Sequence, residues 1–105
     1  MKLLENSFTQ SESKVIVDTD MCKIETFEIA EDLSTATITI HPNSEYMFTA
    51  RSGILTVNVG AGVISTGAES FELNLFNKVA LERNDRVTIT NNQTYPLILN
   101  FISAN

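Results

Sequence analysis

The chain has 105 residues, 43% of them hydrophobic, and carries seven lysines and arginines against thirteen aspartates and glutamates, a net charge of −6. This length suits a single domain spanning residues 1–105 with one hydrophobic core. The negative charge repels a phosphate backbone, which argues against a nucleic-acid partner. No apolar run reaches the length of a signal-peptide core or a membrane span, and one cysteine allows no internal disulfide, so we expect a soluble cytoplasmic protein without membrane association.

The first third of the chain is acidic. Residues 1–12 are mostly polar and form either a loose segment or an edge strand. Six carboxylates lie from Asp18 to Asp32 with Lys23 as the only cation among them, and we interpret them as a solvated face. Residues 24–33 lack a convincing helical stripe of apolar side chains, so we predict a strand followed by an acidic turn.

From Thr35 onward, short runs of alternating apolar and polar residues are separated by turn formers, a pattern typical of a β-sandwich or barrel. Turn formers at residues 51–53 and 60–62 enclose one such run, and this spacing suggests a hairpin. Residues 83–85, Arg-Asn-Asp, predict the tight turn of a second hairpin because asparagine tolerates the left-handed conformation.

The final run, Tyr95 to Ile102, is apolar on both faces. An outward row of Ile98 and Ile102 would promote aggregation unless another subunit covers it, so we expect a homo-oligomer, most simply a symmetric dimer. Alternation assigns one apolar face of each run to the interior of the domain. This predicted interior consists of Ile38, Ile40, Phe48, Leu55, Val57, Leu73, Leu75, Val87, Ile89, Leu97, Leu99 and Phe101.

Few residues are available for metal binding or acid–base chemistry. His41 is the only histidine and Cys22 the only cysteine, so a zinc site lacks its three or four ligands. We interpret His41 as an exposed turn residue and Cys22 as a small core residue. Residues 18–20 with Glu31-Asp32 offer oxygen ligands but not the EF-hand spacing, and the glycines match no phosphate-binding loop. We therefore expect no metal and no cofactor, and we identify no catalytic residue from the sequence.

The segment from His41 to Leu99 nevertheless resembles the cupins, a family of small jelly-roll β-barrels. In their first motif, a pair of histidines precedes a glutamate and a glycine. His41 matches the second histidine, Glu45 follows at a suitable interval and Gly53 comes one residue late, while Thr39 stands where the first histidine belongs.

The second cupin motif is also degenerate here. Asn84-Asp85 replaces its opening Gly-Asp, Thr90-Asn91-Asn92 replaces its turn, and Tyr95 occupies the place of its histidine. The resemblance implies an all-β fold, a cupin-like jelly-roll barrel or sandwich of about eight to ten short antiparallel strands. At best two of the four metal ligands remain, so it does not imply metal-dependent chemistry.

Two short strings are similar to the cupin-fold pyrimidine/purine nucleoside phosphorylases, which need no metal. They are Glu-Tyr-Met-Phe at 45–48 and Ser-Gly-Ile-Leu-Thr-Val at 52–57. This resemblance implies that arginines hold phosphate and that an aromatic ring stacks on the nucleoside. The candidate ligand-binding residues are accordingly Glu45, Tyr46, Phe48, Arg51, Arg83, Arg86 and Tyr95.

Three functions remain open. The first, which we favour, is a non-enzymatic cupin-like domain that binds a small ligand or a protein partner. The second is a metal-independent enzyme similar to the nucleoside phosphorylases. The third is a small structural or assembly module, which would show a flat apolar interface and no pocket for a small molecule.

Overall fold

The computed structural model describes residues 13–30 and 33–104, and within these ranges the chain forms strands joined by turns. The expected all-β fold class is confirmed. No helix in these ranges has the length and apolar character needed to cross a bilayer. Residues 1–12 and the acidic pair 31–32 lie outside the described residues. The strands are β1 (Ser13–Asp18), β2 (Cys22–Ala30), β3 (Leu33–Ile40), β4 (Ser44–Thr49), β5 (Gly53–Val59), β6 (Gly62–Ser65), β7 (Ser70–Leu73), β8 (Lys78–Leu81), β9 (Arg86–Asn91) and β10 (Leu97–Ala104).

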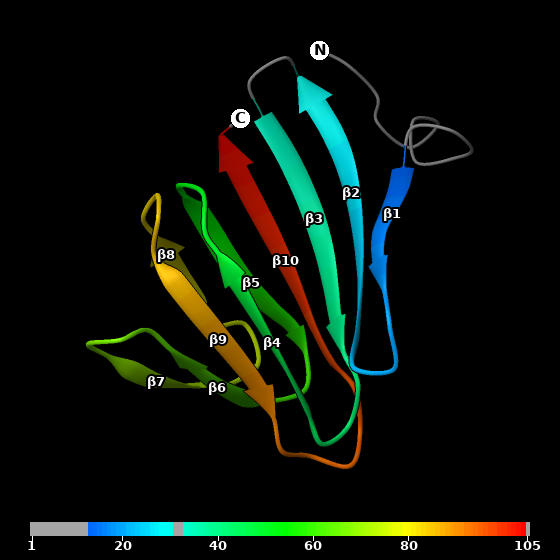
Figure 1. Cartoon of the computed structure of the whole chain (residues 1–105), viewed down its shortest axis with the longest axis vertical. Coiled ribbons are helices and arrows are strands. Elements are labelled where there is room, and N and C mark those ends of the chain that lie inside the picture. Colours follow the sequence, from blue (N-terminus) through cyan, green and yellow to red (C-terminus); the bar gives the residue numbers. More distant parts are fainter. Residues whose placement is uncertain (1–12, 31–32, 105) are drawn as a thin grey trace.

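The strands form two sheets that face each other (Figure 1). The larger sheet has the order β1-β2-β3-β10-β5-β8, and the smaller has the order β4-β9-β6-β7. Every neighbouring pair is antiparallel. Strands from the early and late parts of the chain are therefore neighbours in both sheets, β3 with β10 and β4 with β9, as they are in a jelly roll.

The turns at residues 51–53, 60–62 and 83–85 do not form the expected hairpins. β4 and β5 lie in different sheets, as do β5 and β6, and β8 and β9, so each of these turns carries the chain from one sheet to the other. Gly60 (φ 86°) and Asn84 (φ 74°) adopt the left-handed conformation at two of these turns. Turn chemistry thus marks where the chain reverses, whereas the pairing partner depends on non-local packing.

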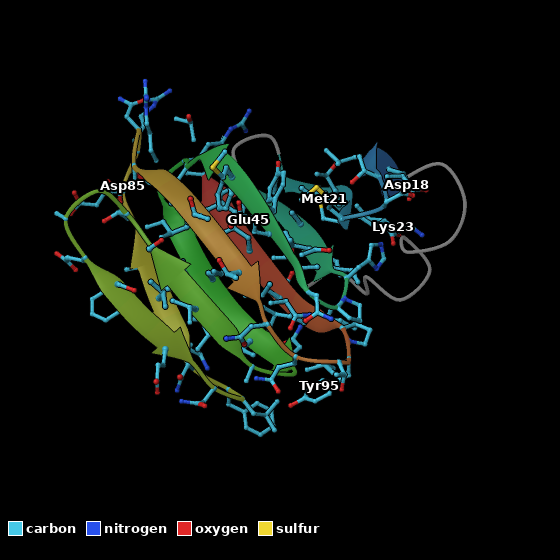
Figure 2. The ribbon with its side chains drawn as sticks, turned by 60° about the horizontal axis from the view of Figure 1, so that its bottom comes forward. Asp18, Met21, Lys23, Glu45, Asp85 and Tyr95 are labelled. Carbon is cyan, nitrogen blue, oxygen red and sulfur yellow. The ribbon has the colours of Figure 1, made fainter. Side chains whose placement is uncertain are left out.

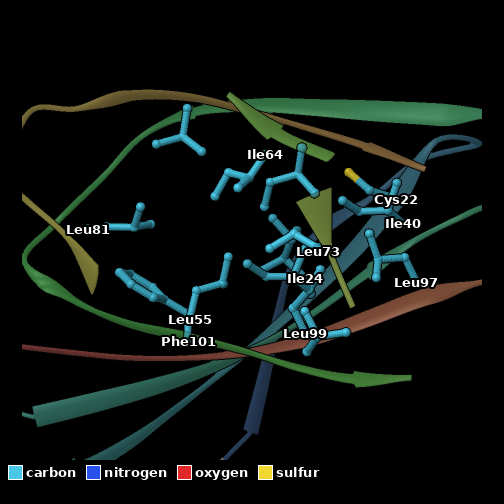
Figure 3. Packing of buried hydrophobic residues seen from close by; sticks show 14 of the residues in the cluster. Cys22, Ile24, Ile40, Leu55, Ile64, Leu73, Leu81, Leu97, Leu99 and Phe101 are labelled. Atoms are coloured by element: carbon cyan, nitrogen blue, oxygen red, sulfur yellow. The ribbon is translucent and has the colours of Figure 1, made fainter. Parts of the chain in front are cut away.

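The hydrophobic core lies between the two sheets, and side chains from both inner faces point toward one another (Figure 3). The predicted interior residues are buried with two exceptions. Phe48 is half-buried and packs against the core. Leu75 is 50% exposed, so its assignment to the interior is wrong. β7 ends at Leu73, and residues 74–77 form a turn in which the Asn77 amide donates to the Asn74 carbonyl at 3.0 Å.

β10 lies at the centre of the larger sheet, between β3 and β5 (Figure 1). Its inward residues are buried, and Leu97 and Leu99 among them are fully buried. On the outer face Ile98 is half-buried, but Ile102 is 44% exposed and lies opposite Ile54, which is 51% exposed. The final strand is therefore apolar on both faces, as expected, and the homo-oligomer inferred from it stays a prediction.

The two sheets do not close into a barrel. β4 and β7 are the edge strands of the smaller sheet, and no ladder in the described part of the chain joins them to the larger one. β4 lies over β2 and β3, whereas β7 is joined to β8 by the turn at residues 74–77. The sandwich therefore has two open sides, which we call the β4 edge and the β7–β8 edge, and each contains a hollow.

Candidate functional site

The hollow at the β4 edge extends between the two sheets and has a volume of about 400 Å³. We call it the inter-sheet cavity. Its walls come from β2, β3, β4 and β10, and the loop after β4 contributes to its rim. The lining residues are Ile24, Thr26, Ser34, Thr35, Ala36, Ile38, Tyr46, Phe48, Thr49, Arg51, Phe101 and Ser103. Apolar side chains and hydroxyl groups thus share the walls.

Two aromatic rings form one wall of the cavity. Alternation along β4 turns Tyr46 and Phe48 toward the larger sheet, while Glu45 and Met47 point outward and are exposed. The centroids of the Tyr46 and Phe48 rings are 5.4 Å apart, with an angle of 14° between the ring planes. This stacked pair is attractive and gives the cavity a broad aromatic wall.

The Tyr46 hydroxyl belongs to a partly buried side chain. Burial raises the pKa of Tyr46, and the nearby Cys22 thiol raises it further by an electrostatic effect. The interpretation of Cys22 as a small core residue is confirmed, because its side chain is 2% exposed. Like any tyrosine at neutral pH, Tyr46 is an uncharged phenol that can donate one hydrogen bond.

The three arginines are at the same end of the molecule but do not share a cavity. The Ala50 amide donates to the Asp85 carbonyl (2.8 Å) and the Asn84 amide donates to the Ala50 carbonyl (2.9 Å), which ties the loop after β4 to the loop before β9. Arg51 lines the inter-sheet cavity. Arg86 lines a separate hollow with Met47 on the outer side of β4, and Arg83 lies exposed in the turn.

The remaining two candidate residues lie away from the inter-sheet cavity. Glu45 pairs with Thr90 of β9 and points out of the smaller sheet. Tyr95 is 47% exposed and lies at the opposite end of the molecule from Asp85 (Figure 2). Of the seven expected ligand-binding residues, the structure brings Tyr46, Phe48 and Arg51 together in one cavity.

The positions that match the first cupin motif do not converge on the core. On β3 the buried residues are Ile38 and Ile40, so Thr39 points to the outer face. His41 follows the strand and is half-buried rather than exposed, because the Met21 carbonyl accepts from its amide at 2.9 Å and its own carbonyl accepts from Asn91 at 3.2 Å. Glu45 also points outward.

These residues do not fit the metal that the cupin motifs imply. Within residues 13–30 and 33–104, no group of three or more histidine, cysteine, aspartate or glutamate side chains could hold a metal ion. The Glu31-Asp32 pair considered as calcium or magnesium ligands lies outside the described residues. We derive no step of chemistry through a metal.

Sequence patterns did not identify the wall of the cavity that β3 contributes. Ser34 and Ala36 alternate with Thr35 and occupy the same inward register as Ile38. Small residues at inward positions leave space where a larger aliphatic side chain would fill the core. The change from Ile38 and Ile40 to Ala36 and Ser34 along one strand face was the available signal for a cavity.

Comparison with protein-family models finds no match, and no curated protein matches the chain. Solved structures do match. AerE from Microcystis aeruginosa has a TM-score of 0.77 at 17% identity, over 88% of this chain and 45% of that protein. Rru_A2000 from Rhodospirillum rubrum, a cupin-2 domain, has a TM-score of 0.70 at 7% identity, over 89% of this chain and 68% of that one. Oxalate decarboxylase from Bacillus subtilis has a TM-score of 0.74 at 11% identity, over 84% of this chain and 26% of that enzyme. The chain therefore has the cupin fold.

Proposed function

We propose that this cupin-fold chain is a non-enzymatic binding domain that accepts one small molecule with a ring-sized apolar body in the inter-sheet cavity. The observation that carries the proposal is the stacked pair of Tyr46 and Phe48 on one wall of a 400 Å³ cavity. Cavities that hold small molecules have volumes of roughly 300–1,000 Å³ and are mostly apolar with a few placed polar groups.

The rest of the lining supports binding. Ile24, Ile38 and Phe101 supply an apolar surface opposite the aromatic wall, so a ring placed between them is desolvated on both faces. Hydroxyl groups of residues such as Thr26 and Ser103 lie among these apolar groups. Such groups fix the orientation of a ligand through hydrogen bonds.

The test fills the cavity with a larger side chain and uses a matched substitution outside the cavity as its control. Ala36 lines the cavity on β3, and Ala36→Phe places a ring in the space that the ligand would occupy. The next residue, Thr37, is exposed on the outer face of the same strand, so Thr37→Phe is the matched control. Benzyl alcohol and benzoate serve as probes, and NMR of isoleucine methyl groups reports where they bind.

We expect both probes to shift the methyl signals of Ile24 and Ile38 in the native chain and in Thr37→Phe, but not in Ala36→Phe. The thermal midpoint of each variant shows whether the fold is retained. Shifts confined to Ile64, at the other open edge, or equal binding by Ala36→Phe, would refute the proposal. Absence of binding by either probe up to millimolar concentration would refute it as well.

A second candidate is an enzyme similar to the cupin-fold nucleoside phosphorylases. The observation in its favour is the presence of Tyr46, Phe48 and Arg51 in one cavity. Arg86 lies on the outer side of β4, however, so a phosphate in the cavity would meet one arginine rather than several. Release of free base from a nucleoside in the presence of phosphate would favour the enzyme, and its absence would favour the binding domain.

A further inference from the structure

We propose that the β7–β8 edge binds an extended segment of a partner protein in which an apolar side chain lies between lysines or arginines. The hollow at this edge has a volume of about 350 Å³ and lies between the two sheets. It is separate from the inter-sheet cavity, so binding here does not depend on the function proposed there. The observation that carries the proposal is an inward-facing aromatic ring that the fold leaves uncovered.

That ring belongs to Phe71 on β7. Phe71 pairs with Ile64 of β6, so both side chains project from the inner face of the smaller sheet. Ile64 is 2% exposed, whereas Phe71 is 52% exposed. The inner face of one sheet in a sandwich is normally covered by the other sheet, and here that cover does not extend over Phe71. Apolar surface of the interior is therefore open to solvent at this edge.

The floor of the hollow can hold an apolar side chain. Ile64 and Phe71 line it from the smaller sheet, and Val79 and Leu81 of β8 line it from the larger one. Leu81 is buried, and Val79 is half-buried against the core. An apolar side chain placed among these residues would be removed from water, which favours binding.

The two strands that border the hollow are both edge strands. β7 ends the smaller sheet and β8 ends the larger one, and within residues 13–30 and 33–104 each pairs with a strand on one side only. An edge strand presents backbone N–H and C=O groups to which an extended segment of another chain can bond. A segment bound in this way places one side chain in the hollow and its neighbours at the rim.

The charge at the rim selects the kind of segment. Glu69, Glu82 and Asp85 line the hollow, and Glu72 lines a neighbouring hollow together with Lys78. Lysines or arginines on either side of the apolar residue would be attracted to these carboxylates. A second copy of this chain would bring the same carboxylates and a net charge of −6, and would be repelled. The occupant that fits is therefore a cationic segment of a different protein.

Three capped peptides serve as probes of the full chain in NMR titrations at low salt. They are Lys-Val-Lys-Phe-Lys-Val, its acidic counterpart Glu-Val-Glu-Phe-Glu-Val, and Lys-Ser-Lys-Ser-Lys-Ser. We expect the first peptide to shift the amide signals of β7 and β8 and not those of β4. The second and third should bind at least about 10-fold more weakly, because one lacks the attractive charge and the other lacks the apolar side chains.

One pair of variants tests the aromatic contact. Phe71→Ala removes the ring in the hollow, and Phe76→Ala removes a ring that is 71% exposed in the turn after β7 and does not line the hollow. We expect Phe71→Ala to lower the affinity for the first peptide about 10-fold, whereas Phe76→Ala retains it. Equal losses in the two variants would overturn the proposal.

A second pair of variants tests the charge. Glu69→Gln with Glu82→Gln removes two carboxylates of the rim, whereas Asp18→Asn with Asp20→Asn removes two exposed carboxylates at β1, which forms the opposite edge of the larger sheet (Figure 2). Asp85 is left in place because its Oδ2 accepts from the Glu82 amide at 3.0 Å. We expect only the first variant to weaken binding, by about 3- to 10-fold.

The remaining outcomes are also decisive. Equal weakening by the two carboxylate variants, or equally tight binding of the lysine–serine peptide, would show that net charge alone attracts the peptide and would overturn the proposal. Amide shifts centred on β4, or no binding of the first peptide up to millimolar concentration, would overturn it as well. If the thermal midpoint shows that Phe71→Ala is unfolded, the carboxylate variants and the peptide series decide.

Discussion

The two open edges of the sandwich differ in what they expose, although both follow from the same arrangement of two sheets. At the β4 edge the cavity reaches inward to Tyr46 and Phe48 and has a described lining with one positive charge. At the β7–β8 edge the strands are four residues long, and carboxylates surround the hollow. The comparison indicates that the arrangement of the two sheets leaves both openings, whereas the side chains give the openings different charge and lining.

The largest effect that we expect is on the free energy of unfolding. It should differ between two leucine-to-alanine variants, one in the core and one at the β7–β8 edge. Leu99 is fully buried at the centre of the larger sheet, whereas Leu75 is 50% exposed in the turn between β7 and β8. Leu99→Ala should lower the free energy of unfolding by about 2–5 kcal/mol, because it leaves a cavity in the core. Leu75→Ala should change it by about 0.5 kcal/mol or less. Urea unfolding measures both, and equal effects would show that the faces are wrongly assigned.

That difference shows how far the sequence predicts the fold. Alternation correctly placed the buried faces of β3, β5, β9 and β10, because a period of two is a local property of each strand. Alternation failed at Leu75. The strand ends at Leu73, but the alternation of apolar and polar residues in the sequence continues into the turn that follows. It also could not assign pairing partners, since three predicted turns connect strands of different sheets.

The candidate site was predictable in part for a similar reason. Tyr46 and Phe48 belong to the string at 45–48 that resembles the nucleoside phosphorylases, and Arg51, which follows it closely in sequence, was a candidate as one of the three arginines of the chain. Arg86 pairs with Thr49, two residues before Arg51, yet it lines a hollow on the outer side of β4. The face on which Arg86 lies depends on the register between β4 and β9, which the sequence does not reveal. The contributions of β2 and β10 to the cavity could not be predicted, because they depend on the order of the strands in the larger sheet.

A second prediction concerns the polar group that holds the corner next to the β4 edge. Asn91 is fully buried, and its Nδ2 lies within hydrogen-bonding distance of the carbonyls of Ile40 (3.0 Å), His41 (3.2 Å) and Tyr95 (2.8 Å). Asn91 Oδ1 accepts from the Gln93 amide at 2.9 Å. The side chain thereby joins the connection from β3 to β4 to the connection from β9 to β10.

Asn91→Ala should reduce the free energy of unfolding by about 1–3 kcal/mol, because buried carbonyls lose their donor. Hydrogen exchange should increase more in β4 than in β7, since the lost bonds lie at the corner beside β4. Asn92→Ala, at an exposed neighbouring position, is the control. If the increase in exchange is larger in β7 than in β4, the lost hydrogen bonds do not stabilise the β4 side of the sandwich.

The smallest effect that we expect is a pH dependence of the free energy of unfolding, caused by Tyr46 in the aromatic wall. Because burial raises the pKa of Tyr46 in the folded chain, folding favours the uncharged phenol. This contribution to stability is fully present below about pH 10, the usual pKa of tyrosine, and is lost as the pH rises through the raised value. Tyr46→Phe should remove this loss from the pH profile of urea unfolding, whereas Tyr95→Phe should retain it. Identical profiles for the native chain and Tyr46→Phe would contradict the buried position of this hydroxyl.

The central place of β10 has a consequence for how the chain folds during synthesis. Residues 97–104 are translated after all the other described strands, yet they lie between β3 and β5 and bond to both. Until they leave the ribosome, the larger sheet consists of two separate parts, β1-β2-β3 and β5-β8, each with an unpaired edge. Edges of this kind can pair with other chains, so the pairing of β10 with both parts removes two places at which the nascent chain could otherwise aggregate.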